Sequence, residues 1–172
     1  MRVFIVGYMG SGKTSFGKKL AAFLGYKHLD LDQQIVEEDG RAINQIFEEE
    51  GELYFRKLEH HRLEALSNED NCVISTGGGA AVHQNNMALM KSKGVTVYMQ
   101  TTAKALYSRL KQGTQERPIL KGLDETGLYH FIEEHLEKRH PVYNEAHIKV
   151  DSLQWKQLNL EQFKTELEAV VI

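Results

Sequence analysis

The sequence is poor in cysteine and in proline. Cys72 is the single cysteine among 172 residues, which excludes an internal disulfide framework and a zinc site built from several cysteines. A chain of this kind is typical of a reducing environment, and we expect a cytoplasmic location. Pro118 and Pro141 are the only prolines, and no Pro/Ser-rich linker or repeat divides the chain. Length and continuity predict one domain over residues 1–172.

The sequence also lacks a strong excess of charge and any long apolar run. It has 21 basic and 24 acidic residues, a net charge of −3, so we expect neither nucleic acid nor an anionic membrane surface as a partner. The apolar start at residues 3–6 is too short for the core of a signal peptide. No stretch approaches the ~18 apolar residues of a membrane-spanning helix.

Short apolar runs alternate with helix-like segments along the chain. Runs of this length, with little polar alternation, are typical of strands buried on both faces. We expect strands at residues 3–6, 28–29, 73–75, 95–99 and 148–150. We expect helices at residues 13–24, 43–50, 52–66, 103–110, 128–137 and 160–170. Such alternation predicts an α/β fold with a mostly parallel sheet.

A glycine-rich loop after the first strand matches G-x-x-x-x-G-K-[ST] at every fixed position. The segment runs from Gly7 to Thr14 and opens the first helix. Its glycines let backbone N–H groups surround a phosphate, and the helix adds its positive N-terminal end. Lys13 can reach the β- and γ-phosphates, and the Thr14 hydroxyl can bind Mg²⁺. The motif predicts a nucleoside triphosphate and Mg²⁺ without identifying the acceptor.

Two common classes of phosphate-loop protein are not indicated. The N-K-x-D motif that reads guanine is absent, and the D-x-x-G match at Asp124–Gly127 follows no strand, so we interpret it as chance. The usual Walker B pattern, a strand that ends in Asp, is missing as well. The strand at 73–75 runs instead into Gly77, Gly78 and Gly79.

Acidic residues follow the second strand, as Asp30 and Asp32. Ligands of open α/β sheets collect beyond the carboxyl ends of the strands, where the phosphate loop and the three glycines also lie. Strand alternation would point the two carboxylates to one side, one toward Mg²⁺ and the other toward a hydroxyl. The alternative is that either residue caps a helix. The three glycines at 77–79 suit a backbone that approaches a ligand closely. The alternative is that they form a strained turn.

Together these residues resemble the shikimate kinase family over nearly the whole chain. Beyond the phosphate loop, the ordered set of D-x-D, F-R-x-x-E, G-G-G, R-P-[IL]-L and R-x-P-x-Y is much more specific. These motifs stand at residues 30–32, 55–59, 77–79, 117–120 and 139–143. The resemblance implies a three-layer α/β/α fold with five parallel strands, close to the nucleoside monophosphate kinases. It also implies transfer of phosphate from ATP to the 3-hydroxyl of shikimate by a monomer.

The resemblance implies roles for individual residues on the nucleotide side. Lys13 stabilises the transferring phosphoryl group, Thr14 binds Mg²⁺, and Asp30 lies in the outer shell of that ion. Arg117 rides on a lid at about 112–126 and reaches the phosphates, and Arg109 stacks on adenine. The residues expected to bind ATP are Gly10, Ser11, Gly12, Lys13, Thr14, Ser15, Arg109 and Arg117.

On the acceptor side, the resemblance implies that Asp32 binds the acceptor hydroxyl and can accept its proton. Arg56 and Arg139 bind the shikimate carboxylate, and Glu59 orients Arg56. The backbone of Gly77, Gly78 and Gly79 holds the ring hydroxyls. Guanidinium groups bind carboxylates through two parallel hydrogen bonds, which lysine cannot do. Lys13, Asp32 and Arg117 form the expected catalytic set.

Alternatives remain at this stage. Surface arginines commonly form solvated ion pairs, and Glu59 would pair with Arg56 on a helix in any case. The acceptor could be gluconate or a nucleoside monophosphate, or the chain could be a silent nucleotide-binding module. The eight histidines show no H-x-x-x-H spacing, and we interpret them as surface or packing residues rather than metal ligands.

Overall fold

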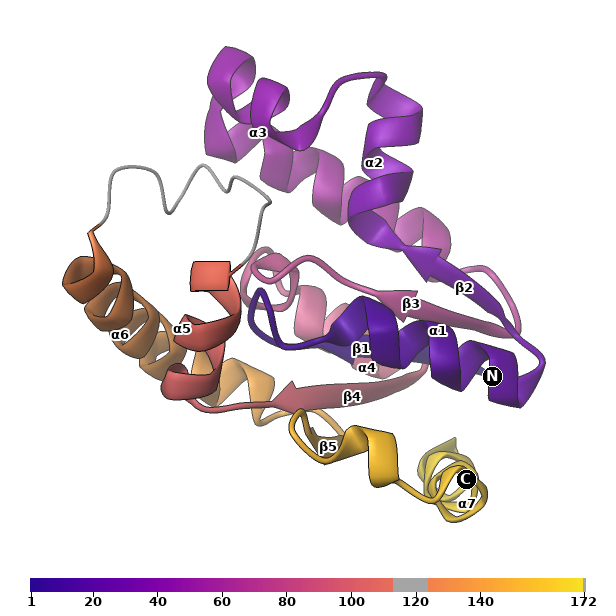
Figure 1. Ribbon diagram of the computed structural model, residues 1–172. Helices are drawn as coiled ribbons and strands as arrows, with labels where there is room; N and C mark the ends of the chain where they lie inside the picture. The colour runs from indigo at the N-terminus through magenta and orange to yellow at the C-terminus, as the bar shows by residue number, and fades with distance from the viewer. Residues whose placement is uncertain (113–123, 172) are drawn as a thin grey trace.

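A five-stranded parallel sheet forms the centre of the protein in the computed structural model, which describes residues 1–112 and 124–171 (Figure 1). The order of the strands in the sheet is β2-β3-β1-β4-β5, and each neighbouring pair is parallel. The strands are β1 (Arg2–Val6), β2 (Lys27–Asp30), β3 (Cys72–Ser75), β4 (Val95–Gln100) and β5 (Ile148–Asp151). The five parallel strands expected from the sequence are therefore confirmed.

Helices connect the strands and cover both faces of the sheet. The helices are α1 (Lys13–Leu24), α2 (Leu31–Asp39), α3 (Ile43–Leu66), α4 (Asn86–Lys93), α5 (Ala103–Gln112), α6 (Glu125–Tyr143) and α7 (Leu160–Val171). Short 3₁₀ turns lie at Ala80–Val82 and Trp155–Gln157. The sequence prediction missed α2 and α4, because each helix buries few apolar side chains: Leu31 and Ile35 in α2, and Met87 and Met90 in α4.

The two faces of the sheet have separate hydrophobic cores. Val3 and Ile5 of β1 point to one face, where α1 and α7 supply side chains such as Phe16 and Phe163. Phe4 and Val6 point to the other face, beneath α3, α4 and α6. Since successive strand residues point to opposite faces, the uninterrupted apolar runs follow from burial on both sides. The result is the expected three-layer α/β/α arrangement.

Helix α3 is broken near its beginning, as the two separate helical segments in the sequence predicted. Gly51 has φ 81° and ψ 173°, a conformation outside the helical region, and the chain continues as a helix after it. The break separates a short first segment from a longer one, which carries Arg56 and Glu59 and contacts α2 through Arg62. In Figure 1, α2 and the start of α3 stand beyond the β2 end of the sheet.

The expected lid differs at both margins from its predicted bounds of 112–126. Gln112 is the last residue of α5, and Asp124 caps α6 by accepting a 2.7 Å hydrogen bond from the Gly127 N–H. The D-x-x-G match is therefore a helix cap. Residues 113–123, which include Arg117, lie outside the described residues. Within the described part of the chain, none of the helices has the length and apolar character to span a bilayer.

Gly17 allows α1 to lie unusually close to the sheet, which generates a stability prediction. A Cβ at Gly17 would lie 2.5 Å from Ser75 Oγ and 3.0 Å from His28 Nε2. We expect Gly17→Ala to lower the free energy of unfolding by about 1–3 kcal/mol, because overpacking outweighs the better helix propensity of alanine. Urea unfolding measures the loss. In a Ser75→Ala background the loss should shrink, and an equal loss in both backgrounds would contradict this packing argument.

Candidate active site

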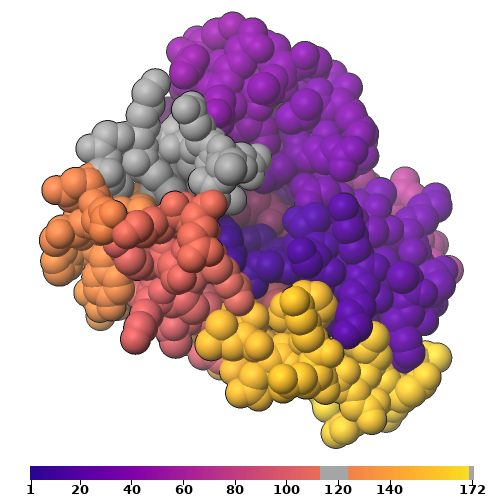
Figure 2. Space-filling model, in the orientation of Figure 1, coloured from indigo at the N-terminus to yellow at the C-terminus, as the bar shows by residue number. Residues whose placement is uncertain are grey.

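The polar segments identified in the sequence meet at one edge of the sheet. The parallel register places Ile5 of β1 beside Ser75 of β3, and Asp30 of β2 beside the same residue. The phosphate loop and the Gly77–Gly79 turn therefore leave the sheet at the same end as Asp30. Figure 2 shows the molecular surface hollowed here, between the purple α2–α3 segment and the indigo phosphate loop. This is the edge at which open α/β sheets bind ligands.

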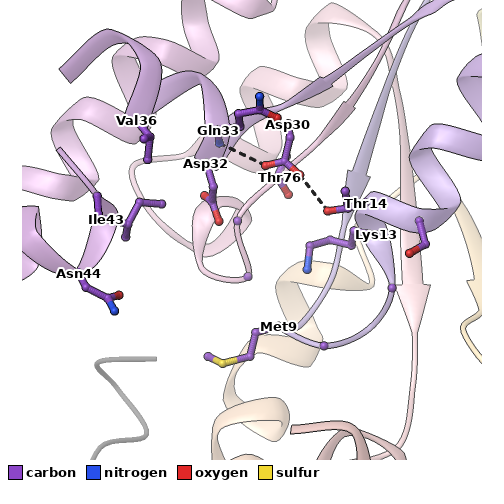
Figure 3. A pocket seen from close by; sticks show the side chains of 16 residues that line it. Met9, Lys13, Thr14, Asp30, Asp32, Gln33, Val36, Ile43, Asn44 and Thr76 are labelled. Atoms are coloured by element: carbon purple, nitrogen blue, oxygen red, sulfur yellow. Dashed lines mark hydrogen bonds between the residues drawn. The ribbon is translucent and has the colours of Figure 1, made fainter. Parts of the chain in front are cut away.

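The hollow has two connected compartments. The larger has a volume of about 700 Å³ and is lined by the phosphate loop, Asp30 and Asp32 (Figure 3). The smaller has a volume of about 160 Å³ and is lined by Arg56, Glu59 and Arg139. The two compartments share Met9, Asp32, Ile43, Asn44, Gly77 and Gly78. The larger volume is in the range of pockets for drug-sized ligands, whereas the smaller fits only a compact molecule.

The phosphate loop has the backbone geometry that its glycines predict. Gly10 and Gly12 have φ values of 77° and 95°, which side chains rarely adopt, and α1 begins at Lys13 directly after them. Lys13 is buried, and its Nζ donates a 2.8 Å hydrogen bond to the Tyr8 carbonyl. In Figure 3 its side chain lies on the same side of the pocket as Thr14. The loop thus presents backbone N–H groups, a lysine and a helix N-terminus to one space.

Asp30 is a helix cap, one of the two alternatives considered from the sequence, and it also contacts Thr14 of the phosphate loop. It caps α2 by accepting from the Gln33 N–H at 3.4 Å, and its Oδ2 accepts a 2.8 Å hydrogen bond from the Thr14 hydroxyl. A hydroxyl and a carboxylate facing a phosphate loop are hard oxygen donors, which suit Mg²⁺. No group of three or more His, Cys, Asp or Glu able to hold a metal occurs within residues 1–112 and 124–171.

Asp32 reaches the pocket for a different reason from the one predicted. The argument from strand alternation is wrong, because β2 ends at Asp30 and Asp32 lies in the first turn of α2. The helix, rather than the pleat of a strand, turns its carboxylate toward the Gly77 backbone. Asp32 lines both compartments, so it marks the boundary between them.

Arg56 is held by two carboxylates on its own helix. Its Nη1 donates to Glu59 Oε2 at 2.7 Å, while Nε and Nη2 both donate to Glu52 Oε1. The Arg56 and Glu59 side chains are 10% and 1% exposed. Burial raises the pKa of Glu59 to about 7, although the charge of Arg56 beside it acts in the opposite direction. The expected contact between Arg56 and Glu59 is confirmed. Glu52 is a second partner of Arg56, and no role was predicted for it.

The three glycines are required by crowding and not by a strained turn. None of Gly77, Gly78 and Gly79 is among the residues with positive φ. A Cβ at Gly77 would lie 2.8 Å from both Asp32 Oδ1 and Glu59 Oε1, and one at Gly79 would lie 2.6 Å from Arg56 Nη2. The backbone therefore passes directly beneath the charged groups of the site.

Arg139 reaches the same glycine segment from α6. Its Nη1 donates a 3.1 Å hydrogen bond to the Gly78 carbonyl, and the Tyr143 hydroxyl donates to the same oxygen. Both side chains are buried. No role was predicted for Tyr143, and His135, on the same face of α6, was interpreted with the other histidines as a surface or packing residue. Their spacing of four residues on either side of Arg139 is the helical signal that could have found them.

Arg109 joins two loops of the nucleotide side. Its Nη1 donates to the carbonyls of Gly10 and Ser11 at 3.1 and 3.2 Å, and its Nη2 donates to the Ser152 carbonyl at 3.0 Å. The structure thus brings it to the phosphate loop, while stacking on adenine stays a prediction. Arg117 lies outside the described residues.

The raised pKa of Glu59 predicts a pH dependence of stability. The folded protein holds this proton more tightly than the unfolded chain, whose glutamate has a pKa near 4.5. Stability should therefore fall as the pH rises from about 4.5 to about 7. We expect Glu59→Gln to reduce this fall, measured by urea unfolding at pH 5 and pH 8. Glu48→Gln, at an exposed position of the same helix, is the control. A variant that keeps the full wild-type slope would contradict the argument.

Comparisons with known proteins agree with this geometry. The family model described as shikimate kinase matches residues 9–168. A shikimate kinase of Parabacteroides distasonis is 44% identical over 151 residues, which cover 88% of this chain and 87% of that protein.

Solved structures of two shikimate kinases share the fold. The crystal structure of the enzyme from Bacteroides thetaiotaomicron superposes with a TM-score of 0.89 at 37% identity, covering 98% of both chains. The structure from Acinetobacter baumannii in complex with shikimate has a TM-score of 0.81 at 30% identity, covering 99% of this chain and 92% of that one. Both the sequence and the architecture around the two-compartment pocket therefore place this chain in the shikimate kinase family.

Proposed function

We infer that the chain transfers the γ-phosphoryl group of ATP to the 3-hydroxyl of shikimate, giving shikimate 3-phosphate and ADP in the shikimate pathway. The observation that carries this function is the joining of a phosphate loop to a small compartment lined by Arg56 and Arg139. Two guanidinium groups in a space of about 160 Å³ suit the carboxylate of a compact hydroxy acid. A nucleoside monophosphate acceptor would require a larger space.

We propose that each of the two compartments binds one of the two substrates. Residues Gly10 to Ser15, in the phosphate loop and the first turn of α1, would hold the ATP phosphates in the larger compartment. Arg56, Arg139 and the backbone at 77–79 would hold shikimate in the smaller one. Asp32, which lines both, would then stand beside the acceptor hydroxyl, where it can orient this group and accept its proton. Because phosphoryl transfer has a loose transition state, such positioning supplies much of the catalysis.

We propose that the charge of the transferring group is balanced from the phosphate loop. Lys13 reaches the space beside the loop and would stabilise the phosphoryl oxygens. Thr14 and Asp30 would hold Mg²⁺, directly and through its outer shell. When bound, this ion neutralises charge on the β- and γ-phosphates. Arg109, by tying the loop to Ser152, keeps the nucleotide side in place.

We also propose that the chain acts as a monomer in the cytoplasm, without nucleic acid or membrane as a partner. One copy supplies both compartments. The net charge of −3 and the free, buried thiol of Cys72 fit this setting.

An acceptor panel tests the function. We expect rapid ADP release from Mg²⁺-ATP with shikimate, and only background release with quinate, gluconate, AMP or no acceptor. A coupled assay for ADP measures each rate. Release with a different acceptor would keep the kinase and discard shikimate. ATP binding without release in any arm would indicate a silent nucleotide-binding module.

Substitutions at the acceptor side should separate transfer from ATP binding. We expect Asp32→Asn to lower kcat by about a hundredfold or more, because the acceptor hydroxyl loses its carboxylate partner. Arg139→Ala should lower kcat/KM for shikimate by about 10–100-fold, the loss of hydrogen bonds to a charged group. Calorimetry with a non-hydrolysable ATP analogue should show unchanged nucleotide affinity in both variants. An equal loss of ATP affinity in both would overturn these roles.

A further inference from the structure

His135 links the arginine of the acceptor compartment to the phosphate loop. It lies one turn before Arg139 on α6, and its Nε2 is 3.4 Å from Arg139 Nη2. Its Nδ1 is 3.2 Å from the hydroxyl of Tyr8, in the phosphate loop. The ring also packs against Phe131 and lies edge-on to Tyr8, with centroids 4.7 and 6.0 Å away. The imidazole is thus fixed on several sides and contacts both halves of the site.

The proton on His135 can be placed from the chemistry of its two neighbours. A guanidinium group has donors and no acceptors, so Nε2 must accept from Arg139. In the neutral ring the proton is then on Nδ1, which donates to the Tyr8 oxygen. Burial, together with the charges of Arg139 and Lys138, lowers the pKa of His135 to about 4. The ring is therefore neutral at physiological pH and can remain an acceptor beside a cation.

Besides His135, Arg139 contacts the Gly78 carbonyl, the Tyr143 hydroxyl and the ring of Tyr8. Its Nη1 donates to the Gly78 carbonyl, and its guanidinium carbon lies 5.5 Å from the centroid of the Tyr8 ring. The ring contact alone leaves the guanidinium free to rotate within its own plane. His135 accepts from the second terminal nitrogen and removes this freedom. Gly78, His135 and Tyr143 each take one contact with the guanidinium, which has five N–H donors, so donors remain for a carboxylate.

We propose that His135 is a positioning residue that sets the in-plane orientation of Arg139 and thereby the affinity for the acceptor carboxylate. The proposal rests on the proposed function, in which Arg139 binds the carboxylate of shikimate. His135 touches neither substrate nor the reacting atoms. Its effect should therefore fall on the KM for shikimate, and kcat and the KM for ATP should change little.

Two polar substitutions separate the contacts of His135. The amide oxygen of glutamine reaches the place of Nε2 and can accept from Arg139, whereas the shorter asparagine reaches only the place of Nδ1, beside Tyr8. We expect His135→Asn to raise the KM for shikimate about fivefold, the loss of one hydrogen bond. His135→Gln should raise it less than about twofold. His130→Asn, at an exposed position of α6, is the control and should change nothing.

A double-mutant cycle tests whether His135 acts through Arg139. In an Arg139→Lys background, which lacks the planar fork, His135→Asn should have no further effect on the KM for shikimate. An undiminished effect in that background, or an equal rise in the KM for ATP, would show a general structural role and overturn the proposal. An unchanged KM in His135→Asn would also overturn it. Failure of the wild-type protein to phosphorylate shikimate would instead refute the proposed function.

Discussion

The absence of side chains at Gly77 and Gly79 is the steric constraint on which the site depends. No Cβ fits at either position, because Asp32, Glu59 and Arg56 approach the backbone to within 3 Å of where it would be. The backbone can therefore lie against both compartments, which share Gly77 and Gly78. Arg139 bonds to the Gly78 carbonyl from the opposite side of the site. A single methyl group here would push apart charges that three different helices bring together.

The Arg56–Glu59 ion pair is largely removed from water. The ion pair of Arg56 and Glu59 has almost no contact with solvent, and the desolvation of Glu59 is strong enough to move its pKa to about 7. Such a pair contributes little net stability, since the cost of removing charges from water offsets their attraction. Its value is geometric, because it fixes the position of a guanidinium in the smaller compartment. His135 orients the guanidinium of Arg139 in a similar way, but its acceptor is a neutral imidazole nitrogen and not a carboxylate.

The phosphate loop and the parallel sheet could be predicted because their signals are local. Gly10, Gly12 and Lys13 stand at fixed spacings after a strand, and buried strands show as short apolar runs. Helix α2 could not be found in this way, because it starts without a linker after β2 and buries two apolar side chains. This is also why the argument for Asp32 failed. Asp32 is oriented by the first turn of α2, a helix that hydrophobic periodicity does not reveal.

The sequence by itself determined the fold class, the phosphate loop and, through its ordered motifs, the family to which the chain belongs. These properties depend on residue type and spacing along the chain, which the sequence states directly. Only the tertiary structure decided which side chains share a compartment and that His135 joins Arg139 to Tyr8, far away in the sequence. Such contacts connect residues up to 127 positions apart, and they arise from how α3 and α6 pack around the sheet edge. No local pattern encodes those distances, because packing sets them.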